Sequence, residues 1–398
     1  MGGEGGWLCH PGPGLGLHSV DFGLVHRNRG ASACGDRGAS GHRGRAALPE
    51  RGMKGRLICL DRLRGREAAA LLVDGRLEDL LIDPPDDRQA PEAIFRAVVD
   101  RPVKGQGGLF VRLPEGSGFL RQTSGLAPGQ RLLVQVSGVA EPGKAAPVTT
   151  RLLFKSRLCI LTPGAPGLNI SRRIRDEDLR AELSALAAEA MAGADEDLGL
   201  ILRSACEGAP DSEIAAEIAE TRALSEAVLA DLAGDPELLV DAPGAHHLAW
   251  RDWSDPPPDE IDEAEGAFAR HGVADLCDAL LSPLVPLGGG AHMAVEPTRA
   301  LVAVDVNTGA DTSPAAALKA NVAAARELPR QLRLRGLGGQ VAIDFAPMPK
   351  KDRVALEQVL RAAFRGEAAE TSLAGWTPLG LYELVRKRDR LPLTELLA

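Results

Sequence analysis

Two carboxylates stand at the ends of two short apolar runs in the last third of the chain. Residues 301–304 are followed by Asp305, and residues 341–343 are followed by Asp344. Both runs are rich in Val and Ile without alternation, which predicts strands buried on both faces. Two carboxylates brought close together repel each other unless one is protonated or a cation lies between them. A hard cation, Mg²⁺ or Mn²⁺, completed by water and substrate phosphate, is the expected solution.

Asn307 strengthens the interpretation of a metal site. It lies two residues after Asp305, so in an extended strand it points to the same side and can orient a carboxylate or a bound water. The alternative is that each Asp only ends a strand or caps the next helix. The presence of two such residues, Asp305 and Asp344, on either side of one helical segment favours the metal site.

These residues lie in two segments, LVAVDVNTG (301–309) and LPRQLRLRGLGGQVAIDF (328–345), and a third segment, GLYELVRKR (380–388), follows. Together they resemble the catalytic core of the ribonuclease E/G family of bacterial endoribonucleases. The resemblance implies that Asp305 and Asp344 bind one Mg²⁺, with Mn²⁺ as the alternative, and that Asn307 supports them. It also implies that the metal activates water to cut single-stranded RNA, which leaves 5′-phosphate and 3′-hydroxyl ends.

The resemblance further implies a multidomain fold of the α+β and α/β classes. We expect an RNase H-like domain with an inserted OB-type RNA-binding barrel and a 5′-phosphate sensor region, followed by a DNase I-like catalytic domain. The expected boundaries are 53–88 and 213–280 for the two parts of the RNase H-like domain, 89–148 for the barrel, 149–212 for the sensor region and 281–398 for the catalytic domain.

The hydrophobic pattern supports several of these elements independently. From Met53 the chain alternates, with a hairpin-like break at Asp74 and Gly75. Between about 92 and 148, short strand-like pieces separated by Gly and Pro predict a small barrel. Residues 313–335 are predicted to form one helix that bends at the interior Pro329.

Three residues of the barrel region fall where the family contacts RNA. Phe110 and Phe119 match aromatic positions that stack on bases, and Lys144 matches a basic residue of the RNA channel. Stacking contributes about 1 to 3 kcal/mol per base and tolerates most sequences. The alternative for Phe110 and Phe119 is that both belong to the barrel core.

The segment LGLILRSA resembles the family's pocket for a 5′-monophosphate, which implies that Arg203 and Ser204 hold the terminal phosphate. Arg suits this role because its planar fork can donate two bonds to one phosphate. The alternative for Arg203 is an ordinary surface ion pair. Clusters of Arg and Lys at 330–335, 350–353 and 386–390 are predicted to provide further positive surface for an RNA backbone.

Composition limits the remaining possibilities. The chain has 398 residues and a net charge of −9, so any nucleic-acid contact must use local basic patches. No apolar run reaches the roughly 18 residues of a membrane span, and we expect no membrane partner. Residues 1–52 are rich in Gly and lack any helical or strand period. We expect them to be disordered or not part of the native protein.

The six cysteines show no CxxC spacing, and a reducing cytoplasm fits them best. The family's larger members carry a Cys motif after the catalytic domain that binds zinc between subunits. The sequence does not show this motif before Ala398. We therefore expect no zinc, and a homo-oligomer, if one forms, that differs from the zinc-linked tetramer.

The main hypothesis is a metal-dependent endoribonuclease of RNA processing or decay. The alternative is an RNA-binding protein of the same fold with little or no nuclease activity. A metal phosphodiesterase for small molecules would explain Asp305 and Asp344 but would leave the phosphate pocket and the basic runs without a role.

Overall fold

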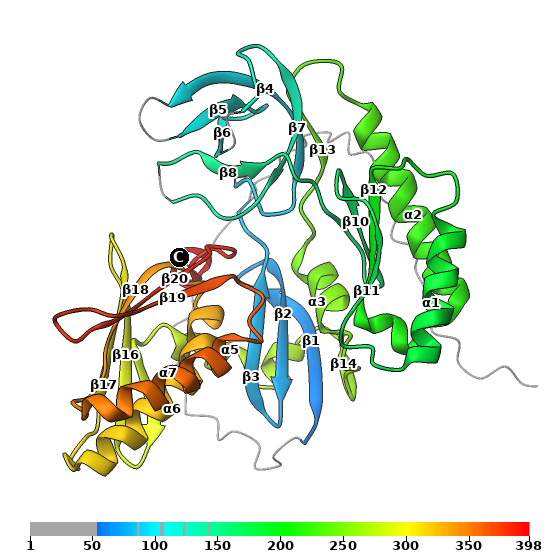
Figure 1. The fold of residues 1–398 in the computed structure, drawn as a ribbon. Coiled ribbons are helices and arrows are strands. Elements are labelled where there is room, and N and C mark those ends of the chain that lie inside the picture. The colour runs from blue at the N-terminus through cyan, green and yellow to red at the C-terminus, as the bar shows by residue number, and fades with distance from the viewer. Residues whose placement is uncertain (1–53, 86–87, 104–106, 122–123, 142, 398) are drawn as a thin grey trace, which may run out of the picture. The chain divides into compact units, whose positions relative to one another are not determined.

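The computed structural model describes residues 54–85, 88–103, 107–121, 124–141 and 143–397. The expectation for residues 1–52 lies outside these ranges. Everything described belongs to one compact unit, residues 46–398, which contains four β-sheets (Figure 1). Within the described residues, no helix combines the length and the apolar character needed to cross a membrane.

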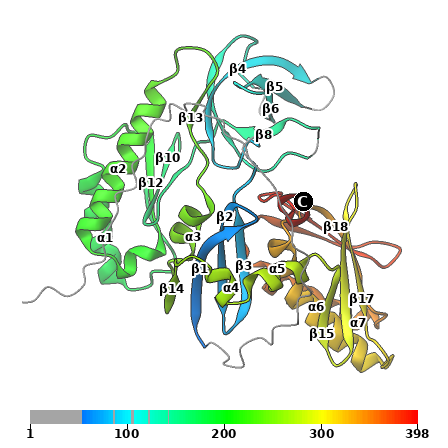
Figure 2. The same cartoon turned by 180° about the vertical axis from the view of Figure 1, so that it is seen from behind.

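The first sheet has the order β14-β1-β2-β3. Its strands are β1 (Arg56–Leu63), β2 (Arg66–Val73), β3 (Arg76–Ile82) and the short parallel strand β14 (Glu260–Asp262). The predicted hairpin is confirmed, because Asp74 and Gly75 turn the chain between β2 and β3 with φ values of 50° and 76°. Three helices pack on this sheet (Figure 2): α3 (Ala245–Trp253), α4 (Ala267–Arg270) and α5 (Val273–Leu280).

The second sheet closes into the predicted barrel. Its strands are β4 (Ile94–Val103), β5 (Gly108–Arg112), β6 (Ser117–Leu120), β7 (Arg131–Val136) and β8 (Ala146–Thr149). The order is β4-β5-β6-β8-β7, and pairing of β4 with β7 closes this OB-like barrel around a core that is aliphatic apart from Phe95. A later strand, β13 (Glu237–Val240), pairs with β4 on its outer edge.

The third sheet has the order β11-β12-β10-β9. It contains β9 (Phe154–Lys155), β10 (Cys159–Pro163), β11 (Leu168–Ile170) and β12 (Leu198–Leu202), and it is covered by α1 (Glu177–Ala190) and α2 (Asp211–Ala230). Ile214 and Ile218 of α2 lie in the core of the third sheet, because the apolar side of this helix packs on β9 and β10.

The fourth sheet, in the order β15-β16-β17-β18-β20-β19, carries the two aspartates. Its strands are β15 (Leu284–Gly288), β16 (Ala291–Pro297), β17 (Val302–Asn307), β18 (Gly339–Asp344), β19 (Thr371–Trp376) and β20 (Tyr382–Arg386). The predicted helix is α6 (Pro314–Leu334), which begins at the N-cap Ser313 and continues through the buried Pro329. A second helix, α7 (Lys350–Phe364), packs beside it.

The expectation that these strands are buried on both faces is wrong. Val302, Val304 and Val306 of β17 are buried together with side chains of α6 and α7 in one core. The alternate residues of the same strand, including Asp305 and Asn307, are more exposed. Because α6 and α7 both cover the same face of the sheet, its other face stays open.

Candidate active site

The two aspartates lie side by side on the open face of the fourth sheet. Strands β17 and β18 are adjacent and parallel, with α6 as the connection between them, and their register places Asp305 directly opposite Asp344. Neighbouring strands are about 4.8 Å apart. Both side chains are exposed, whereas Val304 and Ile343, one residue earlier on each strand, are buried beneath the helices. The fold therefore brings both carboxylates to one accessible place.

Asn307 is bonded to this pair. Its Nδ2 atom donates a hydrogen bond of 2.7 Å to Oδ2 of Asp305. Such a bond fixes the orientation of the carboxylate, as outer-shell partners of metal ligands do. Within the described residues, no group of three or more His, Cys, Asp and Glu side chains could hold a metal ion. A cation at Asp305 and Asp344 would thus depend on water and substrate oxygens for its other ligands, which is the usual arrangement for Mg²⁺.

The open face continues from Asp344 towards the start of β18. Gln340, Ala342 and Asp344 alternate with buried residues, so they share this face. Gln340 and Asp344 are four positions apart, or about 13 Å along an extended strand. The small side chains of Ala342 and of its neighbour Ala303 on β17 leave the surface between these ends shallow.

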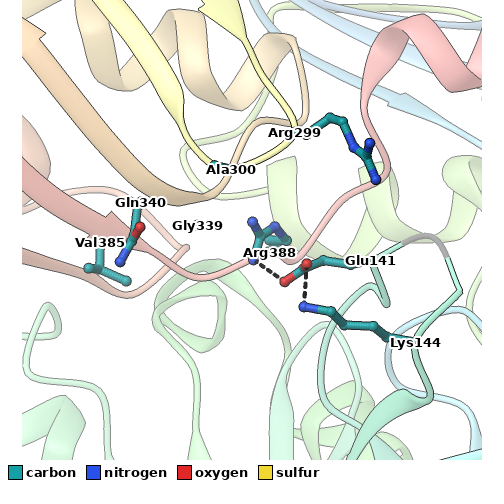
Figure 3. A pocket seen from close by; sticks show the side chains of 8 residues that line it. All are labelled: Glu141, Lys144, Arg299, Ala300, Gly339, Gln340, Val385 and Arg388. Carbon is teal, nitrogen blue, oxygen red and sulfur yellow. Dashed lines mark hydrogen bonds and ion pairs between the residues drawn. The ribbon is translucent and has the colours of Figure 1, made fainter.

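A cavity of about 390 Å³ lies at the start of β18 (Figure 3). Its lining combines the barrel loop after β7 with the fourth sheet: Glu141, Lys144, Arg299, Ala300, Gly339, Gln340, Val385 and Arg388. Glu141 accepts hydrogen bonds from Lys144 Nζ at 2.6 Å and from Arg388 Nη1 at 3.0 Å. The hydrogen bond from Lys144 is the main cause that holds the pKa of the Glu141 carboxyl below its usual value. The predicted RNA-contact residue Lys144 thus shares a cationic cavity with two arginines.

Arg388 is fixed by close backbone packing on both sides. Its carbonyl oxygen accepts a 2.9 Å hydrogen bond from the backbone N–H of Val139. A Cβ atom on Gly138 would lie 2.5 Å from that oxygen, and one on Gly339 would lie 2.2 Å from the guanidinium. Gly339 also has φ +90°, which side chains rarely adopt. Only glycine at these positions lets the barrel loop and β18 approach Arg388 so closely.

Phe110 and Phe119 are cross-strand neighbours on β5 and β6 of the barrel. Their ring centroids are 5.8 Å apart with an interplanar angle of 62°, an edge-to-face contact. Both rings are half-buried and lie outside the barrel's aliphatic core. The guanidinium of Arg101 lies 5.6 Å from the ring centroid of Phe110. Of the two alternatives, the structure supports the surface position over the core position.

Arg203 and Ser204 follow β12 and are both half-buried. The guanidinium of Arg203 donates through Nη1 to the carbonyl oxygens of Ser156 at 2.7 Å and Arg251 at 3.3 Å. Its Nη2 donates to Oδ1 of Asp252 at 2.8 Å. An ion pair was the alternative for Arg203, and the structure contains one.

Ser204 has a carboxylate partner of its own. Its hydroxyl donates to Oδ2 of Asp255, and Arg173 Nη1 lies 3.2 Å from the same oxygen. The sequence pointed to Ser204 but gave no reason to consider Asp252 and Asp255. Asp252 lies in the last turn of α3 and Asp255 follows this helix, both about fifty positions from Ser204, so only the fold shows that they meet.

Five arginines of the first and third predicted basic runs bond to other parts of the protein, whereas Lys350 and Lys351 of the second run are exposed. Arg335 is 6% exposed, and burial lowers its pKa to about 10. Arg386 is also buried and donates to Glu367 at 2.9 Å. Arg330 donates to Glu327 at 2.9 Å, Arg333 to the Glu78 carbonyl oxygen at 2.8 Å and Arg390 to Asp79 at 3.1 Å. These arginines link helices, strands and loops, whereas Arg388 borders the cavity.

Comparison with known proteins places these features in a family. Residues 154–262 and 259–389 match the model of the ribonuclease E/G family. Ribonuclease G of Escherichia coli strain K12 is 32% identical over 303 residues, which cover 66% of this chain and 60% of that protein. Ribonuclease E of a Nostoc species is 28% identical over 386 residues, 83% of this chain and 56% of that protein.

The matched region therefore spans less than two thirds of the length of these relatives. The family match nevertheless covers more than half of the chain and contains both aspartates, Arg203 and Ser204. The chain belongs to the ribonuclease E/G family.

Proposed function

We propose that this protein is a metal-dependent endoribonuclease that cuts single-stranded RNA. The observation that carries the proposal is the register of β17 and β18, which sets Asp305 beside Asp344 with Asn307 bonded to Asp305. The relatives' names describe them as ribonucleases. A role in RNA processing or decay follows from the same likeness.

Asp305 and Asp344 would hold Mg²⁺, or Mn²⁺ as the alternative. Two adjacent, exposed carboxylates fit a hard cation that retains water and takes a substrate phosphate oxygen. When bound, the ion supplies positive charge that stabilises the charged phosphate and acidifies the attacking water. Asn307 keeps the Asp305 carboxylate oriented towards the open face. Attack by water on phosphorus, with loss of the 3′-oxygen as a hydroxyl, gives a 5′-phosphate on the downstream product.

The RNA would follow the cationic and aromatic surfaces described above. Phe110 and Phe119 provide ring faces and edges for bases. Lys144, together with Arg388 at the cavity, would bind a backbone phosphate, and the open face of β18 leads from there to Asp344. Arg203 and Ser204 would contact the 5′ end.

The sheet assignments support a proposal for the domains. We assign the first sheet with α3 to α5 to the RNase H-like domain, the third sheet with α1 and α2 to the sensor region, and the fourth sheet to the DNase I-like catalytic domain. The buried free thiols of Cys59, Cys159, Cys206 and Cys277 fit a reducing cytoplasm.

Cleavage of an A/U-rich single-stranded RNA with Mg²⁺ tests the function. The wild-type chain is compared with Asp305→Asn and Asp344→Asn, which keep the shape of each side chain and remove its charge. We expect the wild type to cleave the RNA internally. The cleavage rate of each variant should be at least about 100-fold lower, which is the size of effect typical of removing one stabilising group at a catalytic site. RNA binding should persist in both.

The outcomes separate the hypotheses. Binding without cleavage by the wild type, in Mg²⁺ and in Mn²⁺, would refute the nuclease and support the RNA-binding alternative. Undiminished cleavage by both variants would refute the assignment of Asp305 and Asp344. The chemistry of the product ends is determined on the 3′-labelled downstream fragment. If its 5′ end carries a phosphate, it accepts a new phosphate there only after phosphatase treatment.

A further inference from the structure

The candidate 5′-phosphate site already contains a carboxylate. The Ser204 hydroxyl and the Arg173 guanidinium both contact the same oxygen, Oδ2 of Asp255. The side chain of Asp255 is 27% exposed, and that of Arg173 is 65% exposed. A hydroxyl and a guanidinium converging on one anionic oxygen is the arrangement that a terminal phosphate would require.

Arg203, the third hydrogen-bond donor of the site, is also bonded to other groups of the protein. Arg203 divides its two Nη atoms between two backbone carbonyls and the Asp252 carboxylate. Asp252 is itself held by Arg251, whose Nε and Nη2 lie 3.1 Å and 2.9 Å from its oxygens. Burial alone would raise the pKa of Asp252, but the bonds and charge of Arg251, with the charge of Arg203, lower it. Asp252 is therefore a negative charge fixed on Arg203, the residue before Ser204.

We propose that Asp255 takes the place of a 5′-terminal phosphate, so that this protein does not distinguish 5′-monophosphorylated from 5′-hydroxyl RNA. The inference rests on the proposed binding of RNA and concerns its specificity at the 5′ end. A terminal phosphate, with about −1.5 to −2 charges at pH 7, would have to displace Asp255 from Ser204 and Arg173. It would then lie beside two carboxylates, and that repulsion offsets the bonds it gains.

The corollary is that Asp255 determines this specificity by its charge. Replacing it with Asn removes one negative charge and keeps the size of the side chain. Ser204 and Arg173 then become available to a stronger, doubly charged acceptor. The variant should acquire a preference for a 5′-monophosphate that the wild type lacks.

Fluorescence anisotropy tests this without cleavage. Two 3′-labelled A/U-rich oligoribonucleotides, identical except for a 5′-phosphate or a 5′-hydroxyl, are titrated with the full chain in EDTA. The measured quantity is the ratio of the two dissociation constants. We expect a ratio within about twofold of one for the wild type and a rise of about 10-fold for Asp255→Asn, the gain from charged hydrogen bonds to a freed pair of donors.

Matched variants make the result specific. Glu207→Gln removes an exposed acidic side chain three residues from Ser204 and should behave as the wild type. Asp255→Ala should reproduce the gain, and Ser204→Ala added to Asp255→Asn should remove most of it. Circular dichroism confirms that each variant is folded.

Two results would overturn the inference. One is a wild-type ratio of about 10-fold or more; the other is a ratio that changes by less than threefold in folded Asp255→Asn and Asp255→Ala. If neither RNA binds to any variant, the proposed function fails and the inference fails with it. If both RNAs bind equally well to all variants, only the inference fails.

Discussion

Removing the carboxylate of Asp79 should destabilise the contact between the first sheet and the elements around the fourth sheet. Asp79 lies on β3 and is 8% exposed. Its Oδ2 accepts hydrogen bonds from Arg390 Nη2 at 3.1 Å and from Trp253 Nε1 at 3.2 Å. Arg333 of α6 lies 3.6 Å from its other oxygen. One buried carboxylate thus connects a strand of the first sheet with α3, α6 and the chain after β20.

The expected magnitude follows from what the substitution leaves behind. Asp79→Ala would leave Arg390 without its buried partner, and an unpaired buried charge costs about 3 to 5 kcal/mol. At about 2 °C per kcal/mol, the lower value for larger domains, the melting temperature should fall by about 6 to 10 °C. Asp278→Ala is the control, because Asp278 is exposed and its side chain has no ion pair within the described residues.

The pH dependence provides a second test. Burial by itself would raise the pKa of Asp79, but the charge and hydrogen bond of Arg390, with the charge of Arg333, hold it below its ordinary value. A lowered folded-state pKa stabilises the fold above the unfolded value of about 3.9, and this contribution is lost as the pH falls through the folded pKa. The difference between wild type and Asp79→Asn should therefore be constant from pH 5 to 8 and shrink below about pH 4.

Differential scanning calorimetry of the wild type, Asp79→Ala, Asp79→Asn and Asp278→Ala gives these values. A fall in melting temperature of less than 2 °C for Asp79→Ala would refute the reasoning that Asp79 stabilises this contact. A difference between wild type and Asp79→Asn that grows as the pH falls would refute the sign of the pKa shift.

Two further predictions concern RNA binding. Phe119→Leu should weaken binding of single-stranded RNA by about 5- to 150-fold, the equivalent of 1 to 3 kcal/mol of lost stacking. Phe119→Tyr, the control, should bind RNA as the wild type does. A change in affinity below twofold in the Leu variant would exclude a stacking role. Arg388→Ala should reduce the slope of log affinity against log salt concentration by about 0.7, the value for one lost phosphate contact on a single strand. Arg365→Ala, at the exposed arginine that ends α7, is its control, and an unchanged slope for Arg388→Ala would place the cavity off the RNA path.

The sequence was most informative where local chemistry determines structure. The turn at Asp74 and Gly75, the helix α6 and the short strands of the barrel depend on neighbouring residues, and all were predicted. Burial was harder to infer. A run such as Val302–Val304 contains only apolar residues whether one face or both are covered, so its composition could not show that α6 and α7 share one face.

At the candidate site, too, local relationships could be predicted from the sequence and long-range contacts could not. The spacing of Asp305 and Asn307 directly implied a shared face, and they are bonded across it. The partners Glu141, Asp252 and Asp255 depend on contacts between segments far apart in the chain, so no spacing indicated them. Counting positive charges was misleading for a related reason, because Arg335 and Arg386 are buried where the sequence shows only another basic residue.

The open face of the fourth sheet explains why several of these features occur together. Asp305 and Asp344 can meet a polymer only if the helices that bury Val304 and Ile343 lie on the opposite side. A polymer that reaches both Asp344 and the cavity would have to cross the stretch of β18 between them, and the small side chain of Ala342 does not obstruct it. At its far end, Gly339 has φ +90° and lies against the Arg388 guanidinium, whereas Gly138 lets the barrel loop approach the Arg388 carbonyl oxygen. A side chain at Gly339 would therefore strain the start of β18 and displace the Arg388 guanidinium, although it lies about 16 Å along the strand from the carboxylates.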